Sequence, residues 1–323
     1  MKNDVPIRKE FSMKKKLLSL AAVLLLSGCG DASETQKSTE KPTETPEITE
    51  TVTEEKDTSV DVVLLYGQSN MEGHTWSQYL VSSVGKDRTL EFNRGYEDVL
   101  ISYECTYNGN SSKKQFVPAK VGQGRTTSHI GPELGMASYF HQKQKMVYMI
   151  KYAKGSTNLY QEWHGYTGGM MGMLYRDAMD YTIEQLELLR QQGLEPKVRA
   201  ICFSQGEADA TSAAYSKYYE NESNMLHDMR EELEDYTPEG GIGFVDMGLT
   251  DNPVITYGDF VNEQKTRIAD EDDNCYYLDV RELGLEYKNE PTGNPDYWHF
   301  DSASMVRLGE LYAETIVEHF LGN

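Results

Sequence analysis

One stretch of the sequence decides the fold, VDVVLLYGQSNM at residues 60–71. Residues 60–66 are almost continuously apolar and rich in β-branched side chains, which is typical of a strand buried on both faces of a parallel sheet. Gly67 permits a tight turn, and Ser69 then stands where a helix would begin. The stretch therefore predicts a strand that delivers a serine hydroxyl to the edge of a sheet where open α/β proteins bind their ligands.

Strands of the same kind recur along the chain, separated by helical patterns. Apolar residues follow helical spacing most clearly over residues 179–189 and 305–320. Alternating strands and helices predict an α/β fold with a parallel sheet that is covered on both faces. Residues 82–128 are polar and poorly periodic, and we expect a long insertion there without assigning elements to it. The further buried strands are predicted at residues 146–153, 198–204, 242–247 and 276–280.

The first 57 residues have a different character. KKK at residues 14–16 precedes the apolar run LLSLAAVLLL at 17–26, and SGC follows at 27–29. A basic start, a short apolar run and small residues are typical of a secretory signal, and the run is short for a membrane span. Residues 30–57 contain nine acidic side chains and no aromatic one, so we expect a disordered linker. The expected organisation is a signal peptide at 1–29, a linker at 30–57 and one domain at 58–323.

LSGC at residues 26–29 resembles the lipobox of bacterial lipoproteins. The resemblance implies cleavage before Cys29 and a lipid on its sulfur, which would attach the exported protein to the bacterial membrane or cell surface. The alternative is an ordinary secreted protein in which this cysteine is incidental.

The net charge of the chain argues against some classes of binding partner. The 323 residues contain 31 basic and 52 acidic side chains, for a formal charge of −21. Nucleic-acid binding needs clustered Lys and Arg, so we expect no nucleic-acid partner. The four cysteines do not make a disulfide scaffold. We expect Cys202 to be a free core thiol, and the sequence leaves a Cys105–Cys275 bridge open.

Polar segments follow the predicted strands and precede the last helix. They are KGST at residues 154–157, QGEAD at 205–209 and DYWH at 296–299. An Asp three residues before a His can accept a hydrogen bond from one imidazole nitrogen and leave the other free as a base. Taken singly, each segment has a simpler explanation: Ser69 as a helix cap, 154–157 as a plain turn, 205–209 as a polar loop.

Together the segments resemble the SGNH/GDSL hydrolase superfamily, in particular its branch of sialate O-acetylesterases and family 6 acetylxylan esterases. The matching stretches are GQSNM at 67–71, IGPELGMA at 130–137, KGST, QGEAD and DYWH. The resemblance implies a three-layer α/β/α, flavodoxin-like fold and removal of acetyl groups from sugars. Two departures are visible: relatives often have Gly-Gly-Thr where this chain has Gly155 and Ser156, and Ser204 displaces the aromatic Phe203 by one position.

The residues support a serine-hydrolase mechanism. We expect Ser69 to be the nucleophile and His299 the base. We favour Asp296 as the residue that orients His299, and the resemblance keeps Glu207 as the alternative. The expected oxyanion donors are the N–H of Ser69, a backbone N–H at Gly155 or Ser156, and the amide of Gln205. The expected substrate contacts are Gln68, Asn70, Trp163 and Trp298, although Trp163 is more simply explained as a core residue.

Other functions remain as alternatives. The chain could be a glycan-binding surface lipoprotein that has lost turnover, or a lipase or thioesterase of the same superfamily. We expect no cofactor and no metal. The acidic stretch beginning at Asp270 fails the EF-hand spacing, because Cys275 stands where a Gly is needed and Arg281 where a Glu is needed. The sequence also lacks the His-Glu-x-x-His motif of zinc hydrolases.

Overall fold

The computed structural model describes residues 58–105 and 109–322. The expected signal peptide with Cys29 and the expected linker at 30–57 lie outside the described residues. Within the described part, the predicted α/β fold with a central, mainly parallel sheet is confirmed, and each predicted strand is present within a few residues of its expected bounds.

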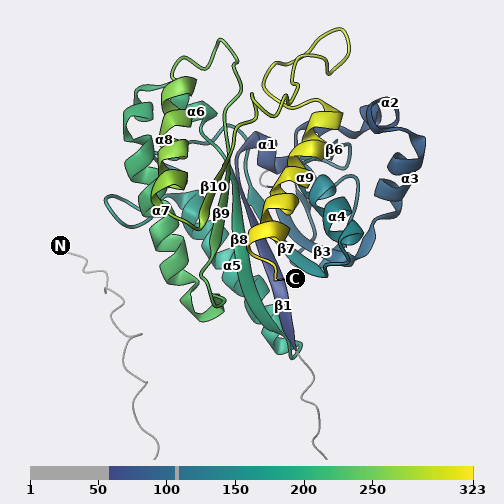
Figure 1. The fold of residues 1–323 in the computed structure, drawn as a ribbon, viewed down its shortest axis with the longest axis horizontal. Coiled ribbons are helices and arrows are strands. Elements are labelled where there is room, and N and C mark those ends of the chain that lie inside the picture. Colours follow the sequence, from purple (N-terminus) through teal and green to yellow (C-terminus); the bar gives the residue numbers. More distant parts are fainter. Residues whose placement is uncertain (1–57, 106–108, 323) are drawn as a thin grey trace, which may run out of the picture. The chain divides into compact units, whose positions relative to one another are not determined.

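Six parallel strands form the centre of the sheet, in the order β10-β9-β8-β1-β7-β3 (Figure 1). Short antiparallel strands pair with β3 at one edge, and a separate two-stranded ribbon joins β2 to β6. The strands are β1 Ser59–Gly67, β2 Thr75–Trp76, β3 Tyr96–Cys105, β4 Asn110–Ser111, β5 Val117–Ala119, β6 His129–Ile130, β7 Val147–Ala153, β8 Glu195–Ser204, β9 Gly243–Met247 and β10 Cys275–Leu278.

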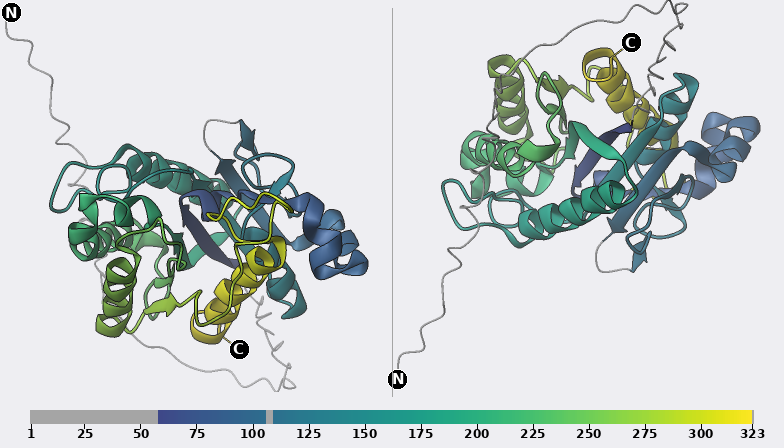
Figure 2. Two further views of the ribbon diagram at one scale, coloured as in Figure 1. Left: turned by 90° about the horizontal axis from the view of Figure 1, so that it is seen from above. Right: turned by 90° about the horizontal axis from the view of Figure 1, so that it is seen from below.

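Helices cover both faces of the sheet (Figures 1 and 2). One core packs α4 and α9 against the sheet, and the other packs α5, α7 and α8 against the opposite face. The α-helices are α1 Ser69–Glu72, α2 Leu80–Val84, α3 Lys86–Arg94, α4 Glu133–Gln142, α5 Met173–Gln191, α6 Glu207–Ala210, α7 Tyr218–Glu232, α8 Gly258–Glu271 and α9 Ser302–His319. Short 3-10 turns occupy Ser77–Tyr79, Ala213–Lys217 and Glu234–Tyr236.

The strand order reverses at β1. The chain leaves β1 to build β3 and β7 on one side, and then crosses to build β8, β9 and β10 on the other. Ligands of open α/β sheets bind beyond the carboxyl ends of the strands at such a reversal. The segment that follows β1, which begins with Gln68 and Ser69, therefore lies where this architecture places a site.

The region from 82 to 128 differs from the sequence-based expectation of an insertion without elements. It contributes α3 and the ten-residue strand β3, which pairs in parallel with β7. β3 was missed because it carries Glu97, Asp98 and Glu104, which are exposed or half-buried near the edge of the sheet. Its inward side chains, such as Val99 and Ile101, are fully buried and supply the apolar face that a strand needs.

The three described cysteines, Cys105, Cys202 and Cys275, are buried free thiols. The prediction for Cys202 is confirmed, and the bridge left open between Cys105 and Cys275 is not formed. Among the described residues, no helix is both long enough and apolar enough to cross a lipid bilayer.

Candidate active site

Ser69 is the first residue of α1 and follows β1 after a single residue, Gln68. Gly67 makes this turn possible, because its φ is 144° and a Cβ there would lie 2.2 Å from the carbonyl oxygen of Ser204 on β8. The Gln68 N–H donates to that same carbonyl at 2.9 Å. The backbone N–H of a first helical residue has no intrahelical partner, and within residues 58–105 and 109–322 the Ser69 N–H has no hydrogen-bond acceptor.

His299 and Asp296 form a hydrogen-bonded pair in the loop before α9. The His299 Nδ1 lies 2.6 Å from Asp296 Oδ2, and Asp296 Oδ1 accepts from the N–H groups of Trp298 and His299 at 2.8 and 3.0 Å. Burial opposes ionisation of Asp296, but the hydrogen bond from His299, its positive charge when protonated and the two N–H donors hold the pKa of Asp296 below its usual value. The pair leaves His299 Nε2 free of Asp296.

Asn70 connects this pair to the serine. Its Nδ2 donates to the carbonyl of Trp298 at 3.3 Å, and its Oδ1 accepts from the N–H of Phe300 at 3.4 Å. The main chain on both sides of His299 is therefore bound to the residue next to Ser69. Asn70 is 2% exposed and fully engaged within the protein, so the structure gives it a positioning role where a substrate contact was expected.

Glu207 shares the Asn70 Nδ2 group with the carbonyl of Trp298. Its Oε1 accepts from Asn70 Nδ2 at 3.0 Å, and its Oε2 is buried without a hydrogen-bond partner among the described residues. Burial raises the pKa of Glu207. Of the two candidate carboxylates, Asp296 is thus the one that hydrogen-bonds the imidazole of His299, and Glu207 binds the Asn70 carboxamide.

Gln205 is placed differently from the expected oxyanion donor. It is completely buried, and its Nε2 donates to Asp209 Oδ2 at 2.7 Å and to the carbonyl of Thr157 at 3.2 Å. A third, longer contact of 3.4 Å reaches Gln68 Oε1. The Gln205 amide therefore joins segments of the site to one another. Sequence spacing alone did not reveal that Asp209 would accept a hydrogen bond from the Gln205 amide.

The turn after β7 also differs in detail from the expectation. The Gly155 N–H donates to Glu72 Oε2 at 2.7 Å, and a Cβ at this position would lie 2.9 Å from the same oxygen. Among the described residues, the Ser156 N–H has no hydrogen-bond acceptor, and Ser156 has a φ of 60°. Ser156 thus has a left-handed backbone, which glycine adopts more easily than serine. Of the two expected backbone donors, Ser156 is the one left open.

Sequence reasoning missed a second histidine–carboxylate pair. His74 Nε2 lies 2.7 Å from Glu72 Oε2, and the His74 ring packs on that of His299 with 4.5 Å between ring centroids. Burial is the largest cause that lowers the pKa of His74. The pair could have been found from the sequence, because Glu72 and His74 lie only three and five residues after Ser69. It was missed because the orienting carboxylate was expected three residues before a histidine, and Glu72 lies two residues before His74.

The two tryptophans expected to contact substrate have different surroundings. Trp163 is completely buried, and its indole N–H donates to Thr157 Oγ1 at 3.0 Å, so it is a core residue and cannot meet a sugar. Trp298 is 37% exposed and its neighbour Tyr297 is 51% exposed. These two aromatic rings next to His299 are open to solvent. In the described ranges, no group of three or more His, Cys, Asp or Glu side chains is placed to hold a metal ion.

The chain also matches a protein-family model. A model of the family described as "Carbohydrate esterase, sialic acid-specific acetylesterase" matches residues 59–318. The chain belongs to this family. The esterase is accordingly a carboxylic ester hydrolase of the carbohydrate esterase class, and its sheet and helices have the SGNH-like arrangement that the sequence predicted.

Solved structures show the same fold for this esterase. A protein of Arabidopsis thaliana aligns with a TM-score of 0.56 at 17% identity, over 80% of this chain and 98% of that one. NanS aligns with a TM-score of 0.59 at 15% identity, over 81% and 97%. XAC1771, a carbohydrate acetylesterase from Xanthomonas citri, aligns with a TM-score of 0.50 at 15% identity, over 81% and 56%. No curated protein sequence matches the chain.

Proposed function

We propose that this esterase removes O-acetyl groups from sugars through an acyl-enzyme on Ser69. The observation that supports the proposal is the network around Asn70, which binds the main chain on both sides of His299 to the residue that follows Ser69, while His299 pairs with Asp296. A nucleophile, a base and a carboxylate that orients the base are the three groups that ester hydrolysis by a serine requires.

The mechanism follows from these groups. The Ser69 hydroxyl attacks the acetyl carbonyl carbon while His299 Nε2 accepts its proton. The resulting tetrahedral oxyanion collapses, the bond to the sugar oxygen breaks, and His299 returns the proton to that oxygen. Water then attacks the acetyl–Ser69 ester with the same base, which releases acetate and restores the hydroxyl. Asp296 keeps the proton on His299 Nδ1 and stabilises the imidazolium.

The oxyanion would be held by donors that the protein leaves open. The Ser69 N–H at the start of α1 is one, and the Ser156 N–H is the second. For the side-chain donor we propose Gln68 in place of Gln205. Gln68 accepts from Gln205 through Oε1, and among the described residues its own amide nitrogen has no acceptor. Loss of one such donor typically costs about 3 kcal/mol of transition-state stabilisation, so Gln68→Ala should lower kcat about a hundredfold.

The substrate we propose is an acetylated glycan, with Trp298 and Tyr297 stacking on a sugar ring beside His299. The family name points to acetylated sialic acid, and the resemblance also covers acetylxylan. Acetate release from a panel of acetylated xylans and O-acetylated sialic acids tests this proposal. Wild-type protein should release acetate from at least one substrate and Ser69→Ala from none. Equal hydrolysis of an aryl acetate by both proteins would overturn the assignment of Ser69.

We propose further that the esterase is exported and anchored by a lipid on Cys29, which the lipobox-like LSGC supports. Metabolic labelling with a fatty-acid analogue in a bacterial host tests this. Label is expected on the full-length protein and not on Cys29→Ser, and equal labelling of the two would contradict the proposal.

A further inference from the structure

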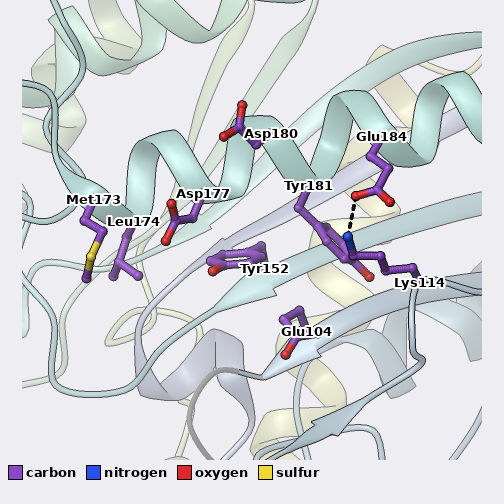
Figure 3. Close-up of a pocket in the computed structure, with 9 residues that line it drawn as sticks. All are labelled: Glu104, Lys114, Tyr152, Met173, Leu174, Asp177, Asp180, Tyr181 and Glu184. Atoms are coloured by element: carbon purple, nitrogen blue, oxygen red, sulfur yellow. Dashed lines mark hydrogen bonds and ion pairs between the residues drawn. The ribbon is translucent and has the colours of Figure 1, made fainter. Parts of the chain in front are cut away.

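Two cavities flank the start of α5, and Met173 lines both. The first has a volume of about 540 Å³ and is strongly acidic, with Glu104, Asp177 and Asp180 on its walls (Figure 3). The cation in this cavity, Lys114, pairs with Glu184 at 2.6 Å, as Figure 3 shows. The second cavity has a volume of about 600 Å³ and a different chemistry.

Asn221, on α7, is the residue that marks the second cavity as a site. Asn221 lines this cavity and is only 5% exposed, yet its Nδ2 is buried without a hydrogen-bond partner among the described residues. An unpaired buried amide costs about 1–3 kcal/mol. Nδ2 itself is buried, so a ligand oxygen can accept from it, and remove this cost, only after the Asn221 side chain rotates toward the cavity.

His164 supplies an acceptor in the same cavity. Its Nδ1 lies 2.8 Å from the carbonyl oxygen of Gly165, which can only accept, so Nδ1 carries the proton. In the neutral imidazole, Nε2 is then an acceptor. Gly169 packs closely on this ring, because a Cβ there would lie 2.7 Å from Cε1 and 3.0 Å from Nε2, so a larger residue at 169 would cover Nε2. A donor on Asn221 and an acceptor on His164 suit a hydroxyl group, which both accepts and donates.

Besides the polar Gln161 and the charged Lys217 and Glu220, the remaining side chains of the lining are apolar. Met170 is 88% exposed, and Met171, Met173 and Tyr160 are also exposed at the cavity. Exposed apolar side chains gathered at a cavity mark a binding surface. The charged residues on the wall, Lys217 and Glu220, pair with each other at 2.8 Å. A neutral ligand with hydroxyl groups and one apolar face fits this lining, and a pyranose ring has both.

The cavity wall is tied to the candidate active site through Asp209. The two carboxylate oxygens of Asp209 accept from the N–H groups of Leu159 at 2.8 Å and Tyr160 at 3.1 Å. The same carboxylate holds Gln205 Nε2 at 2.7 Å, within the polar segment that follows β8. The backbone that positions Tyr160 in the cavity is thus fixed relative to the segment that carries Glu207.

We propose that this cavity is a second sugar-binding subsite, which takes a neutral pyranose unit of the glycan whose acetyl ester is cleaved at Ser69. This inference rests on the proposed function for its biological meaning, but its binding step is measurable without turnover. It assigns Asn221 and His164 to the sugar hydroxyls, and Tyr160 and the methionines to the apolar face of the ring.

Calorimetric titration of full-length Ser69→Ala with xylohexaose and with cellohexaose tests the subsite. At least one oligosaccharide should bind. Adding Asn221→Leu should weaken binding about tenfold, the loss of about 1.4 kcal/mol of hydrogen bonding. The Tm should stay the same or rise, because among the described residues this amide has no partner to lose. Met170→Ala should weaken binding, and Met146→Ala, which removes a 64% exposed methionine outside the cavity, should not.

Turnover separates this inference from the proposed function. In the active protein, Asn221→Leu should raise KM for an acetylated polysaccharide, and the control Met146→Ala should leave that KM unchanged. Absence of binding by both oligosaccharides, or equal binding before and after Asn221→Leu, would overturn the subsite. Sugar binding together with an inactive wild-type protein would instead count against the esterase mechanism and leave the cavity assignment standing.

Discussion

Asn70 hydrogen-bonds the main chain on both sides of His299, through the Trp298 carbonyl at 3.3 Å and the Phe300 N–H at 3.4 Å. These contacts join residues 228 and 230 positions apart in the chain. A side chain next to the candidate nucleophile therefore determines where the candidate base lies. The segment that carries His299 thus depends on this carboxamide for its position.

Asn70→Ala tests that dependence. The substitution removes two bonds to the 298–300 segment and one to Glu207, so His299 loses its fixed position. Each bond is worth about 1 kcal/mol, so kcat should fall tenfold to a hundredfold because His299 is no longer aligned as a base. KM should change little, because the substitution does not remove a substrate contact. Steady-state kinetics on an aryl acetate measure both parameters. Unchanged kcat in a folded variant would show that Asn70 does not position His299.

Asp296→Asn and Glu207→Gln distinguish the two candidate orienting carboxylates. Asparagine keeps the shape of Asp296 but favours the wrong tautomer of His299, a change that lowers kcat about 10⁴-fold in serine proteases. Glu207→Gln retains an oxygen that accepts from Asn70, so its loss should stay below about tenfold. Comparison of the two kcat values decides between them, and a larger loss in Glu207→Gln would reverse the assignment.

The pH dependence of stability should depend on His129. Burial, followed by the positive charges of His74 and Arg125, lowers the pKa of His129 from 6.5 to about 4. Between these values the unfolded chain binds a proton that the folded protein does not, so the free energy of unfolding falls as the pH falls from 6.5 to 4. Urea unfolding at pH 7 and pH 5 should show a smaller difference for His129→Gln than for wild type.

A matched control for this measurement is His227→Gln, because the His227 side chain is 68% exposed. It should retain the wild-type pH dependence. Equal pH dependence in wild type and His129→Gln would mean that other groups account for the loss of stability in acid. His74 acts in the same direction, since its pKa is also lowered, so the dependence should shrink without vanishing.

Ser156→Gly should stabilise the fold. Ser156 has a φ of 60°, a conformation that costs a residue with a Cβ about 1 kcal/mol relative to glycine. The gain is offset in part by the greater freedom of glycine in the unfolded chain, so the expected increase is about 0.5 kcal/mol. Chemical denaturation measures it, and a clear loss of stability would show that the serine side chain makes a contribution that outweighs its backbone strain.

The sequence was informative wherever local pattern and burial agree. The strands at β1, β7 and β8 could be predicted because both of their faces are buried, which makes them continuously apolar. β3 could not, since it lies near the sheet edge and carries Glu97, Asp98 and Glu104. β3 differs from the central strands in its position in the sheet, and the amino-acid composition of a strand indicates that position only indirectly.

At the site, spacing identified Asp296 as the partner of His299, because the two residues are only three apart. It could not identify the hydrogen-bond acceptors of the Gln205 amide, since Thr157 and Asp209 come from separate segments that meet only in the fold. It also missed Glu72, whose carboxylate binds both His74 and the Gly155 N–H, 83 residues away. Roles set by long-range contacts between polar groups are the part that the sequence did not predict.

The most direct test of the central claim is covalent labelling with a fluorophosphonate, followed by peptide mass spectrometry, because only an activated serine reacts. One adduct is expected, on the peptide that contains Ser69, with labelling slowed strongly in His299→Ala and absent from that peptide in Ser69→Ala. A wild-type protein that folds but takes no label at Ser69, or labels equally fast without His299, would contradict the central claim.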